Sequence, residues 1–224
     1  VGISSIGDTT VVSDKWMLGT RNSFFVGIIA TLLATALGTV AALGLSRPHM
    51  PFKPVLMAIL ISPMIVPLII TAAGMFFFYS KIGLTHSYLG LILAHTALGT
   101  PFVVITVTAT LTGFDTNLIR ASQSLGADTM RTFFKIIMPL ILPGVISGGL
   151  FAFITSFDEV VVVMFIGSVE QITIPKQMWA GLRQETSPVI LCMATCLVAL
   201  SIALLTTVEM LRRRSERLRG IKHR

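Results

Sequence analysis

A moderately polar segment with a central glycine interrupts an otherwise apolar chain at residues 120–143, RASQSLGADTMRTFFKIIMPLILP. The sequence on both sides of it is membrane-like, with long runs that carry no charge. A chain of apolar helices rarely keeps such a segment unless something outside the membrane contacts it. Its meaning therefore depends on the spans around it and on the side of the membrane where it lies.

The composition places the chain among integral membrane proteins. Of its 224 residues 54% are hydrophobic and only 12% are charged, and the mean hydropathy of +0.86 is too high for a soluble domain of this length. Five uncharged runs each hold the roughly 20 apolar residues that a spanning helix needs. They predict helices near residues 23–45, 54–79, 88–112, 139–166 and 187–210. We therefore expect an all-α, polytopic transmembrane helical bundle, with residues 1–224 forming one domain.

The distribution of basic residues predicts the orientation of this bundle. Seven of the seventeen lie in a basic tail at residues 211–224. If this tail is cytoplasmic, alternation of the spans also places residues 46–53 and 113–138 inside, with five more basic residues. Twelve then lie inside and five outside, as the positive-inside bias requires. The net charge of +7 is thus a topology signal, and no nucleic-acid partner is expected.

The same alternation places the first residue, Val1, outside the cytoplasm. Residues 1–16 are then expected to belong to an extracytoplasmic loop, and a preceding span would bring the full chain to six. Small residues at four-residue spacing in the first visible helix predict close packing against another helix: Ala30, Ala34, Gly38 and Ala42. Pro63 and Pro67 predict a bend in the second run, either as a packing kink or as part of a pathway.

The polar segment itself predicts a helix-turn-helix elbow on the cytoplasmic face. A short helix is expected at residues 117–125, and Gly126 can take a turn conformation. A second helix is expected from Thr129 to Ile137, before Pro139. A plain solvated connector would not need a defined glycine between two amphipathic halves.

This elbow resembles the signature loop of the membrane subunits of ABC importers. Their pattern is EAA, three residues, glycine, nine residues, and then I-x-L-P. Ala121, Gly126, Ile136 and Pro139 match that spacing, and Met138 stands in place of the leucine. The resemblance covers essentially the whole chain and implies a fold like that of the type I ABC importer permeases.

The chain departs from the pattern at Arg120, where the family has glutamate, and at Ser122, where it has alanine. In the family the elbow docks into a cleft on a cytoplasmic ATPase. The resemblance therefore implies a coupling surface made of Arg120, Ala121, Ser122, Leu125, Gly126 and Ala127. It also implies a homologous second permease subunit, two ATPase subunits that bind ATP and Mg, and an extracytoplasmic solute-binding protein. This chain would hold no cofactor or metal and would lie in lipid, in the bacterial inner membrane.

Two adjacent acids, Asp158 and Glu159, stand inside an apolar run, SFDEVVVV at residues 156–163. Ionised groups within a span are costly and usually face a cavity or a partner. One interpretation makes them a helix end or loop, with residues 160–166 re-entering. The other makes at least one acid part of a cation path, with Phe157, Tyr79 and Trp179 as aromatic neighbours that attract ammonium groups.

The run FITSFDEVVV, followed by IPKQMWAGLRQETSP, resembles the spermidine/putrescine-type branch of these permeases. A polyamine such as putrescine or spermidine is the solute that this implies, and another small amine or an amino-acid-like solute is the alternative. The second sequence run also predicts a short amphipathic helix around residues 177–183.

Other classes of protein are less well supported by the sequence. It has no GxxxxGK[ST] loop, HExxH or GxSxG motif, so we expect a transport subunit and not an enzyme. An ion-coupled transporter could use only Asp158, Glu159 and His95, and an intramembrane hydrolase would need a nucleophile paired with a base. Neither class explains the elbow, and His95 is more simply a hydrogen-bonded structural residue. Cys192 and Cys196 are interpreted as packing residues.

Overall fold

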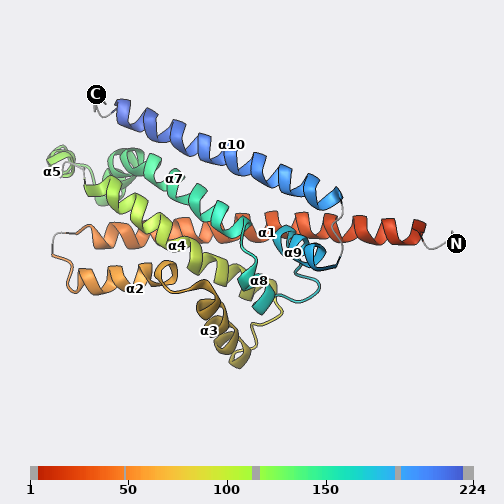
Figure 1. Ribbon diagram of the computed structural model, residues 1–224. Coiled ribbons are helices and arrows are strands. Elements are labelled where there is room, and N and C mark those ends of the chain that lie inside the picture. Colours follow the sequence, from red (N-terminus) through yellow and green to blue (C-terminus); the bar gives the residue numbers. More distant parts are fainter. Residues whose placement is uncertain (1–4, 48, 113–116, 185–187, 219–224) are drawn as a thin grey trace.

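The computed structural model describes residues 5–47, 49–112, 117–184 and 188–218, and every regular element in these ranges is a helix (Figure 1). The elements are α1 (Ser5–Leu45), α2 (Lys53–Ile65), α3 (Leu68–Lys81), α4 (Tyr88–Thr112), α5 (Asn117–Ser124), α6 (Thr129–Thr132), the π-helix η1 (Phe133–Ile137), α7 (Met138–Phe157), α8 (Val161–Ile166), α9 (Ile174–Gln184) and α10 (Pro188–Leu218). Within the described ranges, four helices are long and apolar enough to span a membrane, and α2 with α3 makes a bent fifth candidate. The predicted all-α, polytopic architecture is confirmed.

The core of the bundle lies where α1, α4 and α7 pack together. In the apolar stretch of α4, 67% of the residues are buried inside the chain, whereas only 6% are buried in the apolar stretch of α10. Gly148 of α7 lies so close to α4 that a Cβ there would stand 2.8 Å from the Cα of Val103. Ala34 and Ala42, from the predicted small-residue seam of α1, are fully buried in the same cluster. Small side chains thus let three helix backbones approach closely.

The second apolar run is broken, as its prolines predict. α2 ends at Ile65 and α3 begins at Leu68, with an angle of 103° between them. Pro67 cannot donate a backbone hydrogen bond, so the helix is interrupted at the point where it stands. The bend carries α3 sideways out of the bundle (Figure 1), where Tyr79 and Ala72 join a second hydrophobic cluster with α4 and α8.

Three boundaries differ from the sequence predictions. Helix α1 already begins at Ser5, so the loop expected over residues 1–16 is wrong for its described part; no proline stands there to stop the helix. The run expected as one helix over 139–166 ends at Phe157, and α8 follows as a separate helix of six residues. The second half of the elbow does not stop before Pro139. It continues through η1 into α7, and Pro139 follows directly after the π-helical turn in which the backbone N–H of Met138 donates to the carbonyl oxygen of Phe133.

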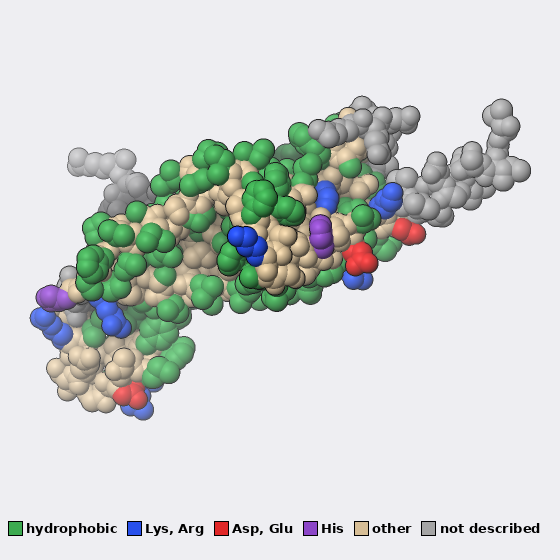
Figure 2. Space-filling view, turned by 90° about the horizontal axis from the view of Figure 1, so that it is seen from below, with side chains coloured by type: hydrophobic (Ala, Val, Ile, Leu, Met, Phe, Trp, Pro, Cys, Tyr) green, Lys and Arg blue, Asp and Glu red, His purple; other side chains and the backbone are tan. Residues whose placement is uncertain are grey.

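The helices bring the elbow and the C-terminal end of α10 to the same end of the molecule. Figure 1 shows α5, the connection from α1 to α2 and the last turns of α10 at one end, here called the elbow end. Helix α9 and the first turns of α10 lie toward the opposite end. Figure 2 shows hydrophobic side chains spread over one face of the bundle, with most charged side chains toward its two ends. This is the distribution that a membrane-spanning bundle requires.

Candidate functional site

The elbow has the shape that its sequence predicts. Helix α5 ends at Ser124, and Gly126 takes a φ of +82°, a left-handed conformation that a side chain would strain. The Asp128 carboxylate then starts α6 by accepting a hydrogen bond of 2.7 Å from the backbone N–H of Arg131. The predicted glycine turn between two helical halves is thus present.

One residue of the predicted coupling surface lies inside the elbow. Ser122 is buried, and its Oγ lies 2.9 Å from Thr132 Oγ1 of α6 and donates to the carbonyl oxygen of Ile119 at 2.8 Å. Because a buried hydroxyl with two partners cannot face another protein, the assignment of Ser122 to the surface is wrong. The residue instead fastens α5 to α6.

The other predicted coupling residues do lie at the surface. Leu125 is 88% exposed at the tip of the elbow, and Arg120, Ala121 and Gly126 are exposed beside it. Ala127 is half-buried. Met130 and Phe134 extend the apolar tip, and Arg131 and Lys135 add exposed positive charge. The elbow therefore presents an apolar tip with basic flanks.

The two acids stand at the break between α7 and α8 and differ in their surroundings. Glu159 is only 7% exposed, and its Oε1 accepts a hydrogen bond of 2.9 Å from the backbone N–H of Val162, in the first turn of α8. Asp158 is exposed. Glu159 thus acts as a helix cap, which agrees with the interpretation of these acids as a helix-end feature. The carboxylate of Asp158 remains accessible to a cation.

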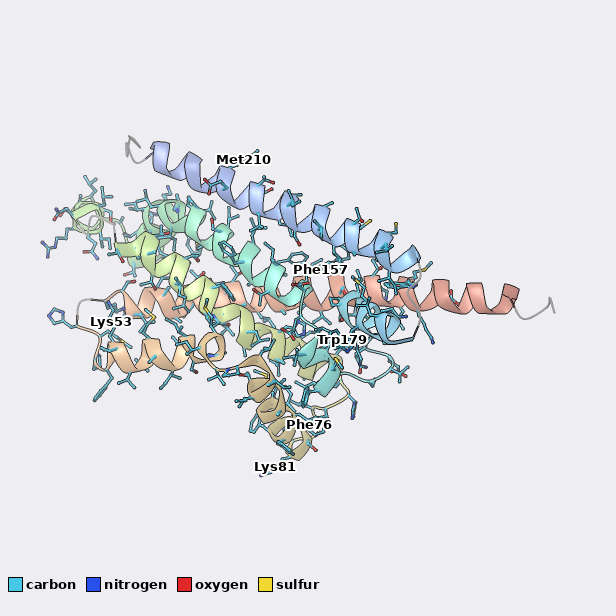
Figure 3. The ribbon with its side chains drawn as sticks, viewed as in Figure 1. Lys53, Phe76, Lys81, Phe157, Trp179 and Met210 are labelled. Carbon is cyan, nitrogen blue, oxygen red and sulfur yellow. The ribbon has the colours of Figure 1, made fainter. Side chains whose placement is uncertain are left out.

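The three predicted aromatic neighbours belong to different parts of the structure. Phe157 packs against Phe24 and Phe153, with ring centroids 5.0 Å and 5.3 Å away. Tyr79 is buried in the cluster formed by α3, α4 and α8. Trp179 is 45% exposed on α9. Figure 3 shows Phe157 at the end of α7 and Trp179 on α9, while Phe76 and Lys81 lie on α3, away from the bundle.

His95 is a structural residue that joins α4 to α7. It is only 1% exposed, and its Nδ1 lies 2.7 Å from Ser156 Oγ. This hydrogen bond supplies the partner that the sequence interpretation required for a structural histidine. A chemical role would need a carboxylate or nucleophile beside it, and the described contacts of His95 supply only the serine.

A set of polar residues at the opposite end was not found from the sequence. Asn22, only 1% exposed, donates through Nδ2 to the carbonyl oxygens of Glu170 and Ile172, at 2.7 and 2.9 Å. Its Oδ1 accepts a hydrogen bond of 3.0 Å from the Tyr88 hydroxyl. The next residue, Ser23, accepts from the backbone N–H of Ile174 at 2.9 Å. Helix α1 therefore holds both the loop at residues 167–173 and the start of α9.

Lys176 completes this polar set. Its Nζ donates to the carbonyl oxygens of Val163 at 3.3 Å, Gly167 at 3.2 Å and Ser168 at 3.2 Å. Burial lowers the pKa of this ammonium group below its ordinary value. A positive charge at these carbonyls complements the negative end of the α8 dipole. In the sequence, Lys176 is a single lysine in a loop with few charges, which could have marked it for attention. Its carbonyl partners could not be inferred without the fold.

Across the described ranges, no three His, Cys, Asp or Glu side chains gather closely enough to hold a metal ion. Cys192 and Cys196 are free thiols, and both are exposed. The two thiols therefore lie outside the core of this chain, and their interpretation as packing residues stays a prediction.

The chain matches known transport proteins over nearly its whole length. Residues 6–217 match the family described as "Binding-protein-dependent transport system inner membrane component". The spermidine/putrescine transport system permease protein PotC of Haemophilus influenzae is 30% identical over 91% of this chain and 79% of the relative. The PotC protein of Escherichia coli K12 is 28% identical over 90% and 76%.

A solved structure supports the same fold. A chain of the MetNI methionine ABC transporter superposes with a TM-score of 0.66, covering 93% of this chain and 96% of that one, at 18% identity. At that identity the likeness concerns the fold alone. Together with the family match and several apolar helices, it indicates a multi-pass protein of the inner membrane. The chain belongs to the family of inner membrane components of binding-protein-dependent transport systems, which are transport permease subunits.

Proposed function

We propose that this chain forms half of the transmembrane path of an ATP-driven importer for a small cationic solute, of which putrescine and spermidine are examples. The observation that carries the proposal is the similarity to PotC over nine-tenths of the chain. An exposed carboxylate at Asp158, at the break between α7 and α8, is chemically suited to a cation. Another small amine or amino-acid-like solute is the second candidate.

The partners follow from the same proposal. A homologous second permease subunit forms the other half of the path, and an extracytoplasmic binding protein delivers the solute. Two cytoplasmic ATPase subunits bind ATP and Mg, while this chain binds neither. The elbow end and the C-terminal tail then face the cytoplasm, where basic residues are favoured.

The elbow is proposed as the contact with the ATPase. Its apolar tip at Leu125 fits a hydrophobic cleft, and its exposed basic flanks at Arg120, Arg131 and Lys135 favour an acidic rim around that cleft. Closure of the ATPase dimer would push on the tip, and α6 and α7 would carry the movement into the membrane.

Uptake by the complete transporter in proteoliposomes tests both the proposed solute and the proposed contact between the elbow and the ATPase. We expect uptake of putrescine or spermidine that requires ATP and the binding protein. Leu125→Ala should lower uptake at least tenfold while ATP hydrolysis and the thermal midpoint stay near wild type, because Leu125 makes few contacts within its own chain. Val169→Ala is the matched control: this side chain is 78% exposed at the opposite end, so uptake should not change.

Two results would contradict these assignments. Uptake that persists without ATP but disappears with the proton gradient would indicate an ion-coupled transporter. Equal uptake by Leu125→Ala and wild type would remove the elbow tip from the coupling surface, whatever the solute is.

A further inference from the structure

Three backbone carbonyl oxygens accept hydrogen bonds from Lys176 Nζ. Val163 contributes from α8, and Gly167 and Ser168 contribute from the turn that follows. We call these three oxygens the carbonyl cradle. A primary ammonium group has three N–H donors and no acceptor, so three convergent carbonyl oxygens match it completely.

The cradle is held in place by hydrogen bonds that do not involve Lys176. The backbone N–H of Gly167 donates to Val163 O at 3.0 Å. Ser168 donates to Gln171 Oε1 through its N–H at 2.9 Å and through its Oγ at 2.6 Å, and Gln171 is buried. Asn22 fixes the loop a few residues further on. The oxygens should therefore keep their positions when the ammonium leaves.

We propose that the carbonyl cradle is a binding site for a primary ammonium group, that Lys176 occupies it as a tethered ligand, and that an ammonium end of the solute displaces Lys176 during transport. The second half of this proposal rests on the function proposed above, whereas the first half does not. Lys176 carries its charge on a flexible four-carbon stem, so it can leave the cradle without any change in the helices.

The exposure of Lys176 favours exchange over a permanent bond. Its side chain is only partly buried, so its ammonium group can reach water when it is released. A free primary ammonium ion carries the same three N–H donors and can compete for the three oxygens.

Thermal unfolding of the complete purified transporter tests the first half. In Lys176→Ala the cradle is empty, and methylammonium chloride should raise the midpoint as its concentration grows, because a ligand that binds only the folded state stabilises it. Tetramethylammonium chloride at equal ionic strength is the control, since it has no N–H to donate. Wild type and Lys81→Ala, which removes an exposed lysine of α3, should respond equally to both salts.

Each outcome of this thermal experiment either supports or overturns the ammonium site. A shift confined to methylammonium and Lys176→Ala supports the cradle. Equal effects of the two salts on Lys176→Ala, or an equal shift from potassium chloride, would overturn an ammonium site. If Lys176→Ala is recovered poorly, its yield during purification in the two salts is compared instead, and equal yields count against the site.

Uptake kinetics test the second half separately. Removing the tethered competitor should lower the KM for putrescine severalfold in Lys176→Ala. An unchanged KM, with methylammonium still binding, would leave the cradle in place and remove it from the path. Failure of any amine uptake by wild type would contradict the proposed function and leave the thermal result untouched.

Discussion

At the scale of single residues, Glu159 and Lys176 form hydrogen bonds at the two ends of α8. The Glu159 carboxylate accepts from Val162 N–H at the start of this six-residue helix, and Lys176 donates to carbonyl oxygens at its end. Helices this short are not stable on their own in water. Opposite charges at the correct ends complement the helix dipole, so both ionic side chains have a structural use that apolar residues could not supply.

Substitutions at position 159 can distinguish the hydrogen bond that the Glu159 side chain accepts from the negative charge that it carries. Glu159→Gln keeps an oxygen that accepts from Val162 N–H, so its thermal midpoint should stay near that of wild type. Glu159→Leu loses the acceptor and should be less stable by about 1 kcal/mol, the usual loss for a helix cap. Differential scanning fluorimetry of the two purified variants gives the comparison.

Asp158→Asn is the control for negative charge at the break between α7 and α8. It removes an exposed charge next to Glu159 and leaves the cap intact, so it should weaken binding of a cationic solute without lowering the midpoint. Equal destabilisation by Glu159→Gln and Glu159→Leu would mean that the charge, and not the hydrogen bond, holds α8.

At the scale of elements, the two halves of the elbow contact each other across the Gly126 turn. The buried pair of Ser122 and Thr132 connects its halves, with hydroxyl oxygens 2.9 Å apart. Because α6 continues through η1 into α7, the Ser122 contact and the Gly126 turn connect α5 to that membrane span.

Substitution of Ser122 should loosen this attachment. Ser122→Ala leaves Thr132 without its buried partner, at a cost of about 1 kcal/mol. Amide hydrogen exchange should become faster over α5 and α6 and stay unchanged in α4. Ser124→Ala removes an exposed hydroxyl bonded to the Arg120 carbonyl and serves as the control. Equal amide exchange rates in Ser122→Ala and Ser124→Ala would contradict a connection between α5 and α6 through Ser122 and Thr132.

The elbow also shows what can be predicted from the sequence of an element and what cannot. The left-handed conformation of Gly126 follows from a glycine between two amphipathic halves. The burial of Ser122 does not, because its partner lies ten residues away on a helix whose direction is set by tertiary packing. The sequence left the end of α7 at Phe157 as one of two interpretations for a similar reason, since the apolar residues before the acids and the valines after them continue an apolar pattern whether or not the helix is broken.

At the scale of the whole molecule, the close contact between α4 and α7 fixes the bundle. A side chain at position 148 would meet the backbone of Val103. Gly148→Val should therefore be less stable by about 1–3 kcal/mol, as is usual for overpacked cores. Gly74→Val is the matched control, because a Cβ at Gly74 would meet no other atom within 4 Å. Thermal midpoints of the two variants measure the difference, and equal midpoints would mean that the two helices can separate without cost.

The spans and their alternation could be predicted because each is a local property of composition and charge. The polar contacts at the opposite end could not. Asn22 reaches carbonyl oxygens 148 and 150 positions away in the chain, and a single asparagine gives no indication of such partners. Pairings between distant residues require the packed structure.

The unbroken run from Thr129 to Phe157 has a mechanical consequence. These 29 residues run from the elbow into the bundle as one span, and Gly144 and Gly148 both let it approach α4 closely. At 1.5 Å per residue, Gly148 stands roughly 28 Å from the elbow end of this span and roughly 14 Å from Phe157. If the span pivots where it is packed against α4, we expect a displacement of the elbow to move Phe157 in the opposite direction by about half as much.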